Sequence, residues 1–257
     1  MKFAKQLFDF YIQSSLHVAI AVMSLVYITT ISTNLSIDFV YPSCVFLGTV
    51  LGYNFLKYYI IFYKGEFHSA KYYGILVVSL LAAIGMILFF FMMSRTIQIS
   101  ILFSGFFVVI YPFLRRFGWL KLFVVSFVVT FITVYIPFIF YKPIVLDYYL
   151  TLIQRFLILI SLLIPFEILD SPTDCKTMNT LPQRFGIQKA KLFGILLVIP
   201  FIVLEFLKVN SSLVVILIGI ITVLAIHFTS LKRDDYYTSF WVESIPIVWM
   251  ILLFLEK

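Results

Sequence analysis

The feature that most constrains this chain is a series of nine apolar segments separated by short polar interruptions. Each segment has about 16 to 22 residues, which is close to the length that a helix needs to cross the hydrocarbon core of a bilayer. The segments lie approximately at residues 15–32, 41–62, 72–93, 97–112, 119–140, 149–166, 190–207, 213–229 and 240–255. They predict an all-α, polytopic membrane protein with about nine transmembrane helices.

The composition excludes a soluble protein. The chain has 257 residues, of which 63% are hydrophobic and 12% are charged, whereas soluble domains average about 25% charged residues. The net charge of +7 does not indicate a nucleic-acid partner, because no basic cluster is accompanied by aromatic residues that would stack on bases. No internal repeat or linker is visible, so we expect residues 1–257 to form a single integral membrane domain.

The distribution of basic residues predicts the orientation in the membrane. If the N-terminus is cytoplasmic, fourteen of the 19 lysines and arginines fall on the cytoplasmic side and five on the other. Such an excess orients multi-pass proteins, and we expect the inner, cytoplasmic membrane as the location. Phe3, Leu7, Phe10 and Tyr11 share one helical face, which predicts an interfacial helix before the first span.

One stretch of the chain, residues 165–186, gathers acidic, basic and turn-forming residues. Glu167, Asp170 and Asp174 are spaced by three and four positions, so on a continuing helix their carboxylates would project from one face. Oxygen ligands of this kind suit Mg²⁺, which proteins commonly hold with one or two carboxylates and substrate phosphates. Pro172 lies between the second and third acids and can end or kink the helix before Asp174. The alternative is that the acids only cap and solvate a loop between two helices.

The same stretch resembles the second aspartate motif of the UbiA superfamily of intramembrane prenyltransferases. In that motif two aspartates with three residues between them precede a TLPxRxG-like segment. Asp170 and Asp174 match the pair. The segment that follows is matched by Thr180, Leu181, Pro182, Arg184 and Gly186. The resemblance implies a UbiA-like helical bundle and a polyprenyl diphosphate or other isoprenoid lipid as the partner.

The first aspartate motif of the family is degenerate in this chain. The family has an asparagine followed by aspartates in the loop after the second span, and Asn54 matches the asparagine. Phe55, Tyr58 and Phe62 stand at the aspartate positions, and an aromatic ring cannot coordinate a hard cation. We therefore expect at most one Mg²⁺, at the acidic loop. Lys57 can neutralise a phosphate as a point charge, or its ammonium can snorkel to the membrane interface instead.

Basic residues complete the expected site. Residues 111–116 resemble a family segment in which a tyrosine and a proline precede two basic residues. The planar guanidinium of arginine is suited to binding phosphate. A basic pair at this helix end is also what the predicted membrane orientation requires. The residues expected to contact diphosphate are Asn54, Lys57, Arg115, Arg116, Lys176 and Arg184.

Two functions are compatible with these residues. The first is Mg²⁺-assisted transfer of a prenyl group from a polyprenyl diphosphate to a lipid or aromatic acceptor, with Asp170, Asp174 and Glu167 as metal ligands. The second is a catalytically inactive UbiA-fold protein that binds isoprenoid lipid or serves as a membrane assembly partner, because a fold alone does not determine function. The sequence identifies no general acid, general base or nucleophile.

The orientation gives a first testable prediction. A cysteine introduced at Lys176 should react with a membrane-impermeant thiol reagent only from the cytoplasmic side, because the acidic loop follows the sixth span. Labelling of inverted and right-side-out vesicles measures this, and reaction from the extracytoplasmic side alone would contradict the topology.

Overall fold

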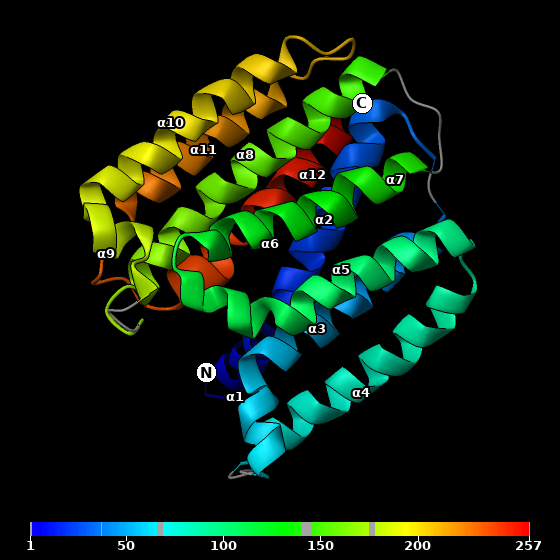
Figure 1. Ribbon diagram of the computed structural model, residues 1–257, viewed down its shortest axis with the longest axis vertical. Helices are drawn as coiled ribbons and strands as arrows, with labels where there is room; N and C mark the ends of the chain where they lie inside the picture. Colours follow the sequence, from blue (N-terminus) through cyan, green and yellow to red (C-terminus); the bar gives the residue numbers. More distant parts are fainter. Residues whose placement is uncertain (1, 37, 66–68, 140–144, 175–177, 257) are drawn as a thin grey trace.

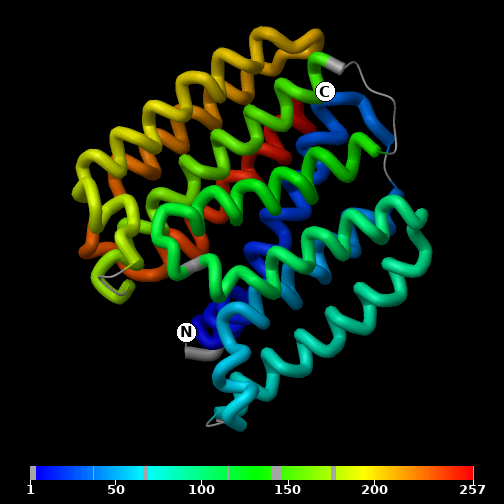
Figure 2. The backbone as a smooth tube through the Cα atoms, in the orientation of Figure 1, coloured from blue at the N-terminus to red at the C-terminus, as the bar shows by residue number. Residues whose placement is uncertain are grey.

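The computed structural model describes residues 2–36, 38–65, 69–139, 145–174 and 178–256. Within these ranges the chain is almost wholly helical and has no β-strand (Figure 1), as the apolar segments predict. The tube trace in Figure 2 shows long rods that run back and forth between two ends of the molecule. The all-α fold class predicted from the sequence is confirmed.

The described part of the first half of the chain contains five α-helices, a short 3₁₀-helix and a sixth rod that consists of three consecutive helical pieces. The helices are α1 (Lys2–Gln13), α2 (Leu16–Thr33), α3 (Val40–Lys64), α4 (Ala70–Phe91), α5 (Arg95–Leu114) and the 3₁₀-helix η1 (Arg115–Phe117). The sixth rod is built from α6 (Leu120–Thr130), the π-helix η2 (Phe131–Tyr135) and α7 (Ile136–Ile139).

The second half contains the longest helix and the motif segment. The elements are α8 (Val145–Asp170), α9 (Leu181–Phe185), α10 (Ile187–Glu205), α11 (Val214–Phe228), the π-helix η4 (Tyr237–Val242) and α12 (Ile245–Glu256).

Each of the nine predicted spans corresponds to a helical rod. Eight of these rods are long and apolar enough to cross a membrane. The ninth, Val214–Phe228, is also apolar but has 15 residues. The helix α1 precedes the first span as a separate element, because Ser15 turns the chain with φ 63°.

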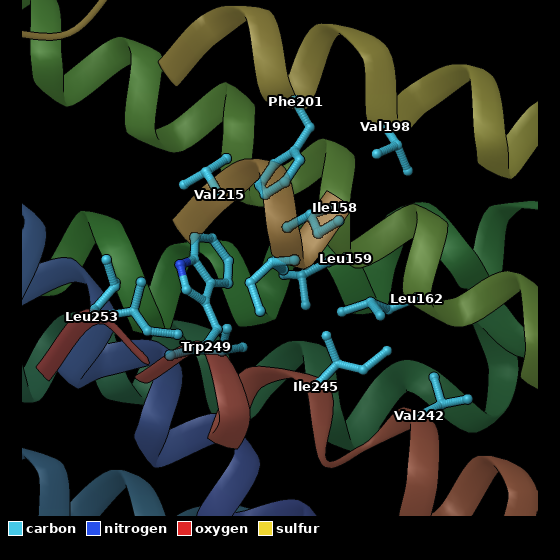
Figure 3. Close-up of a cluster of buried hydrophobic side chains, with 13 residues drawn as sticks. Ile158, Leu159, Leu162, Val198, Phe201, Val215, Val242, Ile245, Trp249 and Leu253 are labelled. Carbon is cyan, nitrogen blue, oxygen red and sulfur yellow. The ribbon is translucent and has the colours of Figure 1, made fainter. Parts of the chain in front are cut away.

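A large cluster of buried apolar side chains joins α8, α10, α11 and α12 with α2. Figure 3 shows Phe201 of α10 and Trp249 of α12 within this core, where their rings meet edge to face at 5.5 Å between centroids. Ile158 of α8 and Ile218 of α11 are fully buried in the same cluster. By contrast, α4 has a face of exposed apolar side chains: Leu80, Leu81, Ile84 and Leu88. In a membrane such a face contacts lipid tails.

A buried arginine joins three rods near the middle of the bundle. Arg155 of α8 is 2% exposed, and its guanidinium donates to the backbone oxygen of Leu25 at 2.7 Å. It also reaches the hydroxyls of Thr133 at 3.4 Å and Thr29 at 3.3 Å. The guanidinium lies 5.3 Å from the ring centroid of Trp249. A planar fork with five N–H donors is suited to several acceptors at once, which a lysine ammonium on a flexible stem cannot match.

The contacts of Arg155 predict that Arg155→Lys destabilises the fold although the charge is kept. The shorter, point-like ammonium cannot keep all three oxygens within reach, so a buried cation loses partners. We expect a loss of about 1–3 kcal/mol in unfolding free energy, the range for a hydrogen bond to a charged group. Thermal unfolding in detergent micelles measures it. Arg95→Lys, at an exposed position, is the matched control, and equal melting temperatures for the two variants would contradict the prediction.

Candidate functional site

The acidic loop begins where helix α8 stops. The helix ends at Asp170, and the backbone N–H groups of Thr173 and Asp174 both donate to the carbonyl of Asp170 at 2.9 Å. This turn contains Pro172, whose ring is incompatible with a continuing helix. The predicted helix end before Asp174 is confirmed. The three carboxylates would share one face only on a continuing helix, and because α8 ends at Asp170, only Glu167 and Asp170 are on it.

The TLPxRxG-like segment shapes the loop through Gln183. Thr180 precedes helix α9, and its N–H donates to the Gln183 side-chain oxygen at 3.2 Å, which is half of a capping box. The amide nitrogen of Gln183 donates to the backbone oxygens of Ser171 at 3.3 Å and Asp174 at 3.2 Å. A single side chain thus fixes the loop backbone on both sides of Pro172.

A glycine allows the start of the sixth rod to touch this loop. Gly118 has φ 50°, a region that side chains with a Cβ rarely adopt. A Cβ atom at this position would lie 1.9 Å from the backbone oxygen of Met178 and 2.7 Å from that of Asn179. The backbone at Gly118 and the segment after the acidic loop therefore pack directly against each other.

Lysine 121, three residues later, brings two of the acids together. Its Nζ lies 2.9 Å from Oε1 of Glu167 and 2.7 Å from Oδ2 of Asp174. All three residues are buried, with 4%, 4% and 7% of their surfaces exposed for Lys121, Glu167 and Asp174 respectively. Burial of a charge in such a place is costly unless the charge is paired. The three residues therefore form one ion cluster that joins α6, α8 and the acidic loop.

The residues present do not fit a magnesium ion. Asp170 is exposed, and across the described parts of the chain no three His, Cys, Asp or Glu residues are grouped closely enough to hold a metal. Glu167 and Asp174 both turn an oxygen to the Lys121 ammonium, which occupies the position between them. The second oxygen of Glu167 is buried and has no hydrogen-bond partner in the described structure.

The degenerate first motif on α3 makes contacts between helices. Asn54 is fully buried, and its side-chain nitrogen donates to the hydroxyl of Ser79 on α4 at 2.9 Å. Tyr58 donates to the backbone oxygen of Gln13 at 2.9 Å. Phe55 is 39% exposed, and its ring contacts that of Tyr59 at 5.5 Å between centroids. Asn54 thus belongs to the α3–α4 interface.

Lys57 points to the junction of α1 and α2. Its Nζ donates to the hydroxyl of Ser15 at 3.3 Å and lies 5.9 Å from the ring centroid of Tyr53. Glu243, which directly follows η4, interacts electrostatically with Lys57. The accessible Lys57 side chain and Glu243 are therefore a second charged group at the same end of the bundle as the ion cluster.

The remaining expected phosphate ligands are peripheral or undescribed. Arg116 is exposed. Arg184 is exposed and lies with its guanidinium 5.1 Å from the ring centroid of Phe185. The side chain of Arg115 and all of Lys176 lie outside the described residues. Sequence reasoning missed Lys121 and Glu243 as members of charged groups. The available signal was that each is a charged residue inside an apolar segment, where such residues usually have a partner.

The described residues form a polytopic, all-α membrane fold in which a lysine is paired with two carboxylates at the acidic loop. The chain resembles the solved structure of a digeranylgeranylglyceryl phosphate synthase with a TM-score of 0.59 and 15% sequence identity. The match covers 98% of this chain and 96% of the other, so the resemblance extends over the whole fold. No protein-family model and no curated protein sequence matches the chain. The UbiA-like fold expected from the sequence motif is confirmed.

The close approach at Gly118 yields a prediction for the loop. Gly118→Ala should displace the segment around Met178, because the new Cβ would meet a backbone oxygen and the residue would keep a positive φ. We expect a loss of about 1–3 kcal/mol in unfolding free energy, the usual range for local backbone strain. Gly105→Ala is the control, since a Cβ there meets nothing within 4 Å. If the two variants melt at the same temperature, the proposed packing is incorrect.

Proposed function

We propose that this protein binds an isoprenoid lipid with an anionic head group inside its UbiA-like bundle. The observation that supports this most directly is a continuous run of aromatic side chains between α5 and α6 that extends into the π-helix η2. The ring contacts link Phe103, Phe107, Phe127, Phe131 and Tyr135, with centroid separations from 4.5 to 6.1 Å.

The aromatic run has accessible surface. Phe103, Phe127 and Tyr135 are 45%, 44% and 37% exposed. An unsaturated isoprenoid chain can pack along such rings, and aromatic faces also attract positive charge. In the chain α6 begins at Leu120, so the run leads from the end that carries Lys121 toward the opposite end of the bundle. We therefore propose that the tail lies along this run.

The head group would meet the charged end of the bundle. Lys57 is an accessible cation on α3, and Arg116 and Arg184 are accessible near the acidic loop. Lysine binds phosphate as a point charge and arginine can donate two parallel hydrogen bonds. These residues support an anionic head such as a phosphate or diphosphate, although Asn54 has its amide nitrogen committed to Ser79.

Prenyl transfer is the second candidate function. The observation that favours it is the end-to-end resemblance to a solved synthase, whose name describes formation of digeranylgeranylglyceryl phosphate. Magnesium-assisted transfer would require Lys121 to leave the carboxylates of Glu167 and Asp174, so we derive no step through a metal. Release of labelled diphosphate from polyprenyl diphosphates, measured over a panel of quinone and lipid acceptors with and without Mg²⁺, tests this candidate.

Lipid binding is tested with purified protein in nanodiscs and radiolabelled geranylgeranyl diphosphate. Lys57→Met should lower the affinity about tenfold, which corresponds to about 1.4 kcal/mol, because it removes one charge-assisted contact. Phe127→Ala should also weaken binding, because it interrupts the aromatic run.

The matched control for the charge is Lys232→Met, at an exposed position in the last loop on the same side. It should leave the affinity unchanged. Equal affinities for the native protein, Lys57→Met and Lys232→Met would remove Lys57 from the site. Absence of saturable binding by the native protein would contradict the proposed function itself.

A further inference from the structure

In the ion cluster of Lys121, Glu167 and Asp174, the position between the two carboxylates is filled by the ammonium group of Lys121. Lys121 is the second residue of α6, and its ammonium reaches one carboxylate at the end of α8 and another in the loop that follows. The two contacts, 2.9 and 2.7 Å, are of the length expected for charge-assisted hydrogen bonds.

The surrounding backbone keeps this ammonium in place. Gln183 holds the carbonyl of Asp174, and the backbone at Gly118 lies against the carbonyls of Met178 and Asn179. Lys121 follows Gly118 by a single turn, and its N–H donates to the Gly118 carbonyl at 3.2 Å. The lysine and the loop are therefore fixed to each other independently of the ion pair.

A divalent cation and this ammonium would compete for the same oxygens. Magnesium binds carboxylate oxygens at about 2.0–2.1 Å and needs a regular set of ligands. Oε1 of Glu167 and Oδ2 of Asp174 both lie within hydrogen-bond distance of Nζ. A metal that contacted both would have to sit against a like charge in a buried place, which is strongly unfavourable.

We propose that Lys121 is the resident cation of the acidic site and takes the place of a divalent metal there. The native chain then has two carboxylates that share one ammonium, which fills the position between them that a metal would take. Removal of the ammonium leaves Oε1 of Glu167 and Oδ2 of Asp174 without their shared cation, so Lys121→Met should create a divalent-cation site. This inference does not depend on the proposed lipid binding, because the test contains no lipid ligand.

The test is titration of the purified full-length protein with Mn²⁺, followed by electron paramagnetic resonance of the free ion. The native protein should show no saturable site that depends on Asp174. Lys121→Met should bind Mn²⁺ at least about ten times more tightly than the native protein, a difference of about 1.4 kcal/mol. The double variant Lys121→Met with Asp174→Asn should lose this binding.

Lys189→Met is the matched control, since Lys189 is an exposed lysine near the same loop, and its Mn²⁺ binding should equal that of the native protein. Saturable Mn²⁺ binding by the native protein that Asp174→Asn abolishes would overturn the proposal. So would a folded Lys121→Met variant that binds Mn²⁺ no better than the native protein.

Two further measurements apply if Lys121→Met does not fold. The native titration alone then decides whether the acidic pair holds a metal while the lysine is present. Asp174→Asn should also lower the melting temperature equally with Mg²⁺ and with a chelator, because it removes a partner of Lys121 and not a metal ligand. A loss of stability seen only in Mg²⁺ would contradict the proposal.

Discussion

The arrangement of the charged end depends on the contact between the Lys121 ammonium and two buried carboxylates. A lysine near the start of a membrane-spanning rod is costly to bury, and it is tolerated here because Glu167 and Asp174 both accept from it. Asp174 can reach Lys121 only because the chain turns sharply after Asp170. The turn at Pro172 and the ion cluster therefore depend on each other, because the acidic loop must fold back for Asp174 to pair with Lys121.

A second buried cation, Arg155, lies near the middle of the bundle, and its hydrogen-bond partners differ from those of Lys121. Arg155 is also a cation in an apolar helix, but the acceptors found for it are a backbone carbonyl and two hydroxyls. One hydroxyl, that of Thr133, is on the π-helix η2. The Tyr41 hydroxyl donates to the carbonyl of Ile132 in this element at 2.5 Å, and Thr29 donates to that of Thr133 at 2.7 Å. The irregular turn offers carbonyls to neighbouring side chains, as expected where a wider helical turn interrupts the regular hydrogen-bond pattern.

Hydropathy and turn chemistry were sufficient to predict the rods and the end of α8, because both depend on residues close together in the sequence. The apolar segments located the spans, and Pro172 located the helix end. The partners of the polar residues could not be predicted in this way. The positive-inside rule predicts only that Lys121 is one of the fourteen cytoplasmic bases, and the family resemblance predicts Asn54 as a phosphate ligand. Their actual partners, Asp174 and Ser79, are 53 and 25 residues away along the chain, and only the packing of α6 on the acidic loop and of α3 on α4 brings them together.

The aromatic residues at the degenerate motif show how a fold can persist where its metal chemistry does not fit. Tyr58 links α3 to the end of α1 through Gln13, and its ring meets that of Tyr72 on α4 at 6.0 Å. An aspartate at position 58 could provide neither contact at this distance. Asn54 and Tyr58 thus connect α3 to neighbouring helices, whereas Lys57 of the same helix is accessible. Glu167 and Asp174 are paired with Lys121, and Asn54 with Ser79, so these side chains of the two motif segments make contacts within the chain. If the protein binds an anionic lipid, as we propose, Lys57, Arg116 and Arg184 are accessible cations that can contact its head group.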